Sequence, residues 1–127
     1  MFTRKKTPGT TLGRQGEDIA AAFLTRNGYT VIARNYRKTF GEVDIVALHG
    51  EFLVFIEVKT RQSVRFGSPF EAVDRRKQQQ LSKIALDYTV RNNLHDKPAR
   101  FDVVSVLLQD TKQPLVDIIE NAFESCG

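Results

Sequence analysis

The segment from residue 41 to residue 59, GEVDIVALHGEFLVFIEVK, places the strongest constraint on the fold of this chain. Two apolar stretches flank a short turn at His49 and Gly50, which predicts a β-hairpin. In the second stretch, Leu53 and Phe55 alternate with residues that are equally apolar. Because successive side chains of a strand point to opposite faces of its sheet, both faces of this strand need a cover. The segment therefore predicts a central strand with packing on both sides.

Charged residues gather at the end of this hairpin that lies away from the turn. With the turn at the two residues named above, Asp44 lies opposite Phe55. Glu42 then lies opposite Glu57. Alternation places the three acids and Lys59 on one face of the sheet. Asp44 and Glu57 become diagonal neighbours, with Cβ atoms roughly 7–8 Å apart.

Two interpretations of this cluster remain open at this stage. Carboxylates on a hairpin are commonly a solvated polar face, in which Lys59 would pair with Glu57. Charges on the covered face of a central strand are costly, however, unless they are paired or bound to a metal. Mg²⁺ is held by one or two carboxylates, with waters and phosphate oxygens completing its shell. We therefore expect Mg²⁺ or Mn²⁺ at Asp44 and Glu57, with Glu17 or Glu42 completing the coordination directly or through water.

The hydrophobic periodicity elsewhere predicts two helices and three further strands. The helices are expected at 11–27 and 70–92, and the strands at 29–36, 100–108 and 115–119. Thr10 or Thr11 would cap the first helix, and Gly28 would follow its end. The first three strands can form an antiparallel meander, and the second helix is long enough to return the next strand parallel to its neighbour. This order predicts an α/β fold with a central mixed sheet flanked by helices.

Two charged residues fall on or beside the apolar stripes of the predicted helices. Glu17 lies at the edge of the first stripe, where it either keeps its carboxylate in water or faces the acidic hairpin. Lys77 lies within the second stripe. A lysine there usually buries its stem and keeps its amine in water, and the alternative is that it reaches a phosphate or a carboxylate.

The 127 residues carry a formal net charge of +4, which suits a polyanionic partner without requiring one. Basic side chains follow the acidic hairpin closely in sequence, and we expect them to contact a nucleic-acid backbone without base specificity. They are Arg61, Arg65, Arg75, Arg76 and Lys77. Residues 1–10 are expected to be a disordered basic tail, and residues 11–127 a single domain.

The sequence favours a cytoplasmic protein without membrane association. No apolar run approaches the ~18 residues of a membrane span, and the N-terminus has no apolar core of a secretory signal. A single cysteine, Cys126, fits a reducing compartment.

Hydrolysis of a phosphodiester bond uses every part of the acidic cluster. A bound metal would polarise the phosphate and lower the pKa of a bound water, and Lys59 could orient that water or neutralise developing charge. No G-x-S-x-G elbow or P-loop motif occurs. His49 and His95 fall in predicted loops, where exposure to solvent is the simplest expectation.

Seven short motifs spread over nearly the whole chain strengthen this interpretation. They are G-R-Q-G-E at 13–17, N-Y-R at 35–37, G-E-V-D-I-V at 41–46, F-I-E-V-K-T-R at 55–61, F-G at 66–67, R-F-D-V-V at 100–104 and N-A-F at 121–123. An acid followed about a dozen residues later by E-x-K resembles the PD-(D/E)xK nuclease superfamily. The full set is similar to the YraN-like family of bacterial proteins, which are predicted endonucleases related to archaeal Holliday junction resolvases.

The resemblance implies a restriction-endonuclease-like αβββαβ core. It implies metal binding by Asp44 and Glu57, a catalytic role for Lys59, and Glu17 in place of the first-helix acid of resolvase-like members. The function expected is a divalent-metal-dependent endonuclease acting on DNA rather than RNA, with branched or structured DNA as a candidate substrate. Symmetric cutting of a junction would require a two-fold homodimer. The alternatives are a non-catalytic nucleic-acid-binding protein of this fold and a protein-interaction module with a basic docking face.

Overall fold

The computed structural model describes residues 11–62, 73–110 and 112–125, so the expected tail at 1–10 lies outside the described residues. Its elements are α1 (Leu12–Arg26), β1 (Thr30–Lys38), β2 (Gly41–His49), β3 (Phe52–Arg61), α2 (Arg75–Arg91), β4 (Ala99–Leu107) and β5 (Leu115–Ile119). The strands form a mixed sheet in the order β1-β2-β3-β4-β5. β3 and β4 are parallel, and the other neighbours are antiparallel. The predicted α/β fold and its crossover are confirmed.

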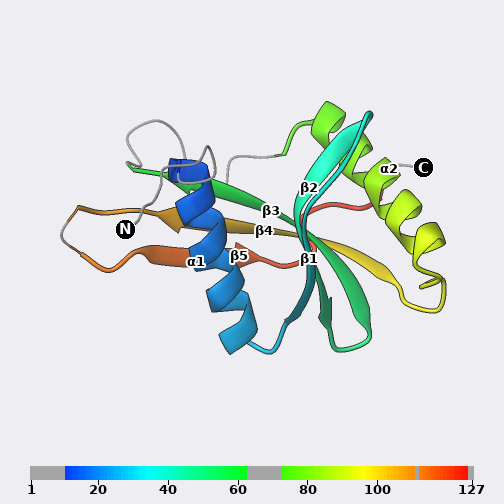
Figure 1. Ribbon diagram of the computed structural model, residues 1–127, viewed down its shortest axis with the longest axis horizontal. Coiled ribbons are helices and arrows are strands. Elements are labelled where there is room, and N and C mark those ends of the chain that lie inside the picture. The colour runs from blue at the N-terminus through cyan, green and yellow to red at the C-terminus, as the bar shows by residue number, and fades with distance from the viewer. Residues whose placement is uncertain (1–10, 63–72, 111, 126–127) are drawn as a thin grey trace, which may run out of the picture.

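Figure 1 shows α1 and α2 on opposite sides of the twisted sheet. One hydrophobic core joins Ala20 and Leu24 of α1 to sheet residues such as Ile56. The other joins α2 to the opposite face of the sheet, including Phe55. Four consecutive β3 residues, 53–56, are at most 1 % exposed. The prediction that this strand is central and covered on both faces is confirmed.

The ends of α1 follow from its capping residues. The side chain of Thr11 accepts a hydrogen bond from the backbone N–H of Arg14 at 3.5 Å, as expected of an N-cap. Asn27 is the C-cap, and Gly28 follows with a φ of +91°. Glycine adopts this left-handed conformation without the steric cost of a Cβ atom. The helix therefore begins and ends within one residue of the predicted bounds.

The second helix begins later than expected. Asp74 caps α2 by accepting a hydrogen bond from the backbone N–H of Lys77 at 2.8 Å, so the helix starts at Arg75. The predicted start at residue 70 was wrong, because Val73 and Asp74 precede the helix. The predicted apolar stripe is confirmed at Val73, Leu81, Ile84 and Tyr88, which are all buried, and its first residue, Phe70, lies outside the described residues.

The hairpin turn is one residue later than predicted. Gly50 and Glu51 form the turn, and His49 pairs with Phe52 as the last residue of β2. Gly50 has a φ of +60°, which suits glycine at the first central position of a two-residue hairpin turn. The predicted register was therefore wrong by two residues. An even shift leaves the side chains of the paired residues, 45–49 and 52–56, on their predicted faces. Continuing the observed register beyond its last pair, Ile45 and Ile56, sets Asp44 opposite Glu57.

A buried polar network holds the turn end of the sheet together. Arg100 forms a two-pronged ion pair with Asp102, whose side chain is fully buried. Tyr29 donates to Asp102 at 2.8 Å and receives a hydrogen bond from Arg100. The ring of His49 stacks on Tyr29 at 3.9 Å and lies 2.8 Å from Arg100 Nη2. The prediction that His49 is an exposed loop residue was wrong, whereas His95 is exposed as expected.

Neither helix among the described residues is long and apolar enough to cross a bilayer.

Candidate functional site

The regular alternation of side chains breaks in β1 and β2 at the same level. Val43 and Val46 of β2 both belong to the core beneath α2, although an odd spacing should separate their faces. Ala33 and Tyr36 of β1, the partners of Val46 and Val43 in the ladder, also pack against this core in spite of their odd spacing. Between the latter two lies Asn35 with a φ of +54°, a left-handed conformation that asparagine tolerates better than most residues. Paired irregularities therefore turn the intervening side chains toward α1.

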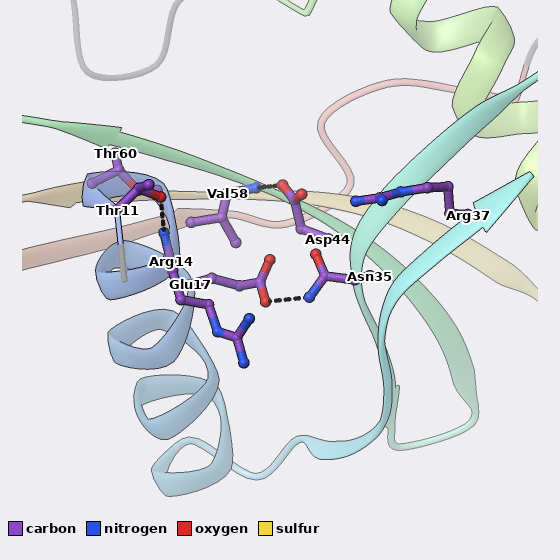
Figure 2. A pocket seen from close by; sticks show the side chains of 9 residues that line it. Thr11, Arg14, Glu17, Asn35, Arg37, Asp44, Val58 and Thr60 are labelled. Carbon is purple, nitrogen blue, oxygen red and sulfur yellow. Dashed lines mark hydrogen bonds between the residues drawn. The ribbon is translucent and has the colours of Figure 1, made fainter. Parts of the chain in front are cut away.

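Asp44 occupies this irregularity in β2, where the paired ladder with β3 has ended. The Oδ2 atom of Asp44 accepts a hydrogen bond from the backbone N–H of Val58 at 2.8 Å. Asp44 lines an open cleft of about 660 Å³ beside α1, together with Glu17 and Asn35 (Figure 2). It also lines a cleft of about 500 Å³ that includes Lys77 of α2. Asp44 is thus accessible from both sides of the sheet.

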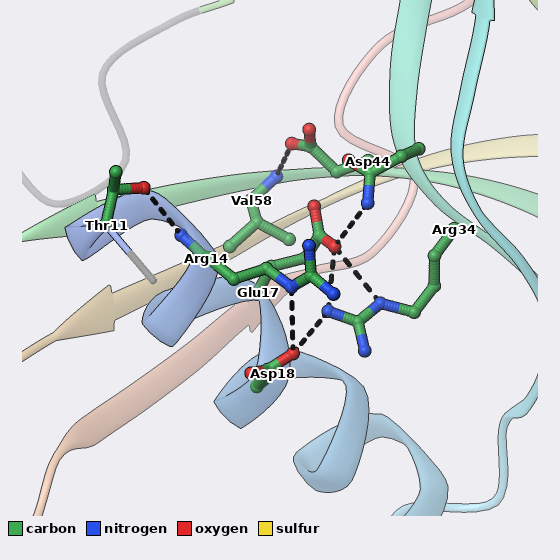
Figure 3. Close-up of polar contacts among 8 residues, drawn as sticks. Thr11, Arg14, Glu17, Asp18, Arg34, Asp44 and Val58 are labelled. Carbon is green, nitrogen blue, oxygen red and sulfur yellow. Dashed lines mark hydrogen bonds and ion pairs between the residues drawn. The ribbon is translucent and has the colours of Figure 1, made fainter. Parts of the chain in front are cut away.

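Glu17 faces inward from α1, which settles the choice left open by the sequence. Its Oε1 atom accepts hydrogen bonds from Arg34 Nη2 at 2.8 Å and from Asn35 Nδ2 at 2.9 Å. Arg34 also binds Asp18 at 2.6 Å, so one guanidinium serves two acids of α1 (Figure 3). The Glu17 side chain is only 8 % exposed and shares the cleft with Asp44. Its charge is therefore paired, and its carboxylate points toward the acid of β2 (Figure 2).

Glu57 projects from β3 toward α2, as its alternation with Phe55 requires. Lys77 approaches it from α2, with Nζ 3.7 Å from Oε1 of Glu57. Both side chains are largely buried: that of Lys77 is 29 % exposed and that of Glu57 is 18 % exposed. Of the two roles open to Lys77, the structure therefore shows contact with a carboxylate. Lys59, two residues beyond Glu57, is also close enough to lower the pKa of that carboxyl.

Burial raises the pKa of both carboxyl groups of the pair. Burial, followed by the charge of Glu57, raises the pKa of Asp44 to about 7 against the pull of the Val58 hydrogen bond and Lys77. Burial also raises the pKa of Glu57, opposed by Lys77, by Lys59 and by hydrogen bonding to Asp44. A pair of carboxyls that share a partly desolvated site and resist ionising together is common in functional sites, although structural ion pairs perturb pKa values too.

The donor chemistry of this pair fits a hard divalent cation. Within residues 11–62, 73–110 and 112–125, no group of three or more His, Cys, Asp or Glu side chains is arranged to hold a metal ion. The pair of Asp44 and Glu57 offers carboxylate oxygens, the ligands that Mg²⁺ takes one or two at a time before completing its shell with water and phosphate. A cation bound beside them would also offset the charge of Glu57 that helps to raise the pKa of Asp44.

The remaining predicted site residues have surroundings of their own in the structure. Glu42 contacts Arg37 across the β1–β2 ladder, with Oε1 3.2 Å from Nε, and its charge raises the pKa of Glu57. Arg61 is the half-buried last residue of β3. Arg75 and Arg76 are exposed in the first turn of α2. The predicted contact at Arg65 lies outside the described residues.

Three residues of the site were not assigned a role from the sequence. Arg34 and Asn35 hold Glu17, and Arg37 lines both clefts beside Asp44. The N-Y-R motif at 35–37 contained the relevant signal. The contact between Asn35 and Glu17 could not be predicted from this motif, because a regular strand alternates its side chains between two faces. Only the paired irregularity brings Asn35 to Glu17.

The described residues define a class of protein: an α/β protein with a mixed five-stranded sheet between two helices, consistent with a restriction-endonuclease-like core. The sequence model described as "Uncharacterised protein family UPF0102" matches residues 16–106. The chain therefore belongs to the UPF0102 family, the YraN-like family that its motifs indicated.

Bacterial relatives extend this similarity over most of the chain. A UPF0102 protein of Trichlorobacter lovleyi is 48 % identical over 114 residues, which cover 89 % of this chain and 90 % of the relative. A UPF0102 protein of Geobacter sulfurreducens is 49 % identical over 113 residues, covering 89 % and 88 %. A UPF0102 protein of Caldanaerobacter subterraneus is 45 % identical over 121 residues, covering 94 % and 99 %.

Proposed function

We propose that this protein is a divalent-metal-dependent endonuclease that hydrolyses phosphodiester bonds in DNA. One observation carries the proposal: Asp44 and Glu57 form a partly desolvated carboxyl pair, and Asp44 lines two clefts that basic side chains also line. Acids that only serve solubility would lie apart in water. Asp44 and Glu57 instead lie close together and partly buried, which costs free energy, and bound Mg²⁺ or Mn²⁺ would offset that cost.

Each residue of the pair has a distinct environment that suits a distinct task. The backbone N–H of Val58 orients Asp44 and leaves its second oxygen free of that bond. Lys77 and Lys59 oppose the rise in the pKa of Glu57 that burial causes, and so favour the charged form of this carboxyl. When bound, the cation would polarise the phosphate and acidify a water. Lys59 would then hold the attacking water or offset charge on the phosphate, and Glu17 would accept a hydrogen bond from a water in the α1 cleft.

DNA is favoured over RNA, and branched or structured DNA over simple duplex, by the motifs shared with resolvase-like nucleases. Cutting both strands of a junction would require a two-fold dimer. Cytoplasmic location is part of the same proposal, because it places the enzyme with its substrate. Arg61, Arg75 and Arg76 would contact the backbone outside the clefts.

The test is a cleavage panel with purified full-length protein. Single-stranded, duplex, flap and four-way junction DNA are incubated with Mg²⁺, Mn²⁺ or EDTA. Cleavage should require metal, and Asp44→Ala should abolish cleavage while sparing DNA binding. Glu51→Gln, an exposed acid in the hairpin turn, serves as the matched control and should cut normally. Failure to cleave any of these DNAs with either metal would overturn the proposal.

A second candidate follows from the ion pair between Lys77 and Glu57. A lysine that already neutralises one acid suits a protein that binds nucleic acid without cutting it. In that case the wild type and Asp44→Ala would bind DNA equally, and neither would cleave in the panel.

A further inference from the structure

We propose that Arg37 is the residue that receives the DNA backbone at the acid pair, and that Glu42 holds Arg37 in place until a phosphate displaces it. The inference deepens the proposed function, since it names a phosphate-contacting residue of the same site. It also assigns Glu42 a role other than metal ligation.

The position of Arg37 between the clefts is the first support. Among the described lining residues, Arg37 and Asp44 are the two that both clefts share. A phosphate that reaches Asp44 from either cleft would therefore lie on a surface that Arg37 also lines. Figure 2 shows the Arg37 side chain at the cleft, across from the α1 residues and beyond Asp44.

The availability of Arg37 is the second support. Its side chain is 68 % exposed, and it contacts Glu42 through a single Nε–Oε1 approach of 3.2 Å. Glu42 is itself 38 % exposed. Ion pairs this exposed contribute about 0–1 kcal/mol, so a phosphate can displace the carboxylate at little cost. The planar guanidinium can donate two parallel hydrogen bonds to phosphate oxygens.

A neighbouring arginine shows the opposite arrangement. Arg34 is 32 % exposed and uses Nε and Nη2 to hold Glu17, while Nη2 also contacts Asp18. Its guanidinium is committed to fixing α1 on the sheet. Arg37 lacks such a commitment to a buried acid, so the two arginines divide into a structural residue and a ligand-contacting residue.

The experiment measures DNA binding by fluorescence anisotropy over a salt series, with a labelled four-way junction and the full chain carrying Asp44→Asn to prevent cutting. Arg37→Gln should weaken binding about tenfold and reduce the slope of log K against log salt by about 0.9, the loss of one phosphate contact. The DNA affinity of Arg37→Lys should lie between those of the parent and Arg37→Gln, because lysine keeps the charge but lacks the planar guanidinium. Arg26→Gln, at the exposed end of α1, is the matched control and should bind as the parent does.

Glu42→Gln supplies a test that depends on sign. Without its carboxylate partner, Arg37 is free, so DNA affinity should rise two- to threefold in EDTA. A metal-ligand role would instead leave DNA affinity in EDTA unaltered and weaken Mg²⁺ binding in calorimetry. Either unaltered or weaker DNA binding by Glu42→Gln in EDTA would overturn the role proposed for Glu42.

The outcomes separate this inference from the proposed function. If the wild type cleaves DNA and Arg37→Gln binds like its parent, the inference fails and the nuclease proposal stands. If Arg37→Gln loses affinity and the wild type cleaves nothing, the nuclease proposal fails and the phosphate contact stands. Absence of DNA binding by the parent overturns both.

Discussion

Asp44 and Val58 are joined at the point where β2 and β3 diverge: the backbone N–H of Val58 donates to Oδ2 of Asp44 at 2.8 Å. The last paired residues of the two strands, Ile45 and Ile56, lie just before this bond. The bond favours the charged carboxylate, but burial and the charge of Glu57 outweigh it and raise the pKa of Asp44 to about 7. The site therefore stores an unfavourable charge at neutral pH.

The first prediction concerns stability and pH. Because the pKa of Asp44 is raised from 3.8 to about 7, the folded protein binds more protons than the unfolded chain between these pH values. The free energy of unfolding should therefore fall as pH rises from about 4 to 7 in EDTA. Asp44→Asn should flatten this dependence and exceed the wild type in stability at pH 8 by about 4 kcal/mol, because about three pKa units contribute roughly 1.4 kcal/mol each.

Urea denaturation of both proteins at pH 5 and pH 8 measures this difference. Asparagine can still accept the Val58 hydrogen bond through its carbonyl oxygen, so the variant removes the charge without removing that bond. Parallel pH profiles for the two proteins would contradict the prediction, because they would show that folding does not raise the pKa of Asp44.

The second prediction concerns metal binding. At pH 8, a Mg²⁺ concentration 100 times its dissociation constant should stabilise the wild type by about 2.7 kcal/mol, because the cation binds the folded state alone. Asp44→Asn and Glu57→Gln should lose this gain. Thermal unfolding with MgCl₂, with CaCl₂ and with EDTA checks it, and Glu51→Gln should respond like the wild type. Equal stabilisation of all variants would place the bound metal elsewhere.

The third prediction separates the two lysines. Lys77 lies 3.7 Å from Glu57 and lowers the pKa of both acids, so it acts as their internal counter-ion. Lys77→Met keeps the apolar stem and removes the charge. The metal-free protein at pH 8 should lose about 1–2 kcal/mol of stability, while calorimetry should show several-fold tighter Mg²⁺ binding.

Lys59→Met is the matched comparison for that experiment. If Lys59 serves the reaction, its loss should reduce cleavage about 100-fold or more and leave Mg²⁺ affinity within a factor of about three. Weaker metal binding by Lys77→Met would contradict the counter-ion role, and unaltered cleavage by Lys59→Met would contradict the catalytic one.

The fourth prediction concerns the contact between α1 and β3. A Cβ atom on Gly16 would overlap the side chain of Thr60, so the helix can approach the strand this closely only with glycine there. Gly16→Ala should destabilise the protein by about 1–3 kcal/mol, the usual cost of overpacking. Thr60→Ala should restore part of that loss, as a double-mutant cycle in urea would show. Independent, additive effects would indicate that the two residues do not share the contact.

The fifth prediction concerns the network at the turn end of the sheet. Asp102 is fully buried, and Arg100 and Tyr29 satisfy its charge. Arg100→Met should lower the free energy of unfolding by about 3–5 kcal/mol, because it leaves a buried carboxylate without its ion-pair partner. Arg100→Met combined with Asp102→Leu should cost less than the single variant. A double variant that is as unstable as the sum of its parts would show that the pair does not act as a unit.

The sequence by itself determined the helices and strands, the central position of β3 and the mixed sheet. Each of these depends on the local period of apolar residues and on the length of a crossover, which neighbouring residues along the chain specify. It also identified Asp44 and Glu57 as neighbours on adjacent strands, although with a register two residues from the one observed.

The tertiary structure decided which side chains meet. The two-residue turn at Gly50 set the register, and the irregularity shared by Asn35 and Asp44 opened the acid of β2 to clefts on both sides of the sheet. Packing of α2 brought Lys77 to Glu57. These contacts join residues 9 to 20 positions apart in the chain, and the balance of burial, charge and backbone geometry that selects them exists only once the chain has folded.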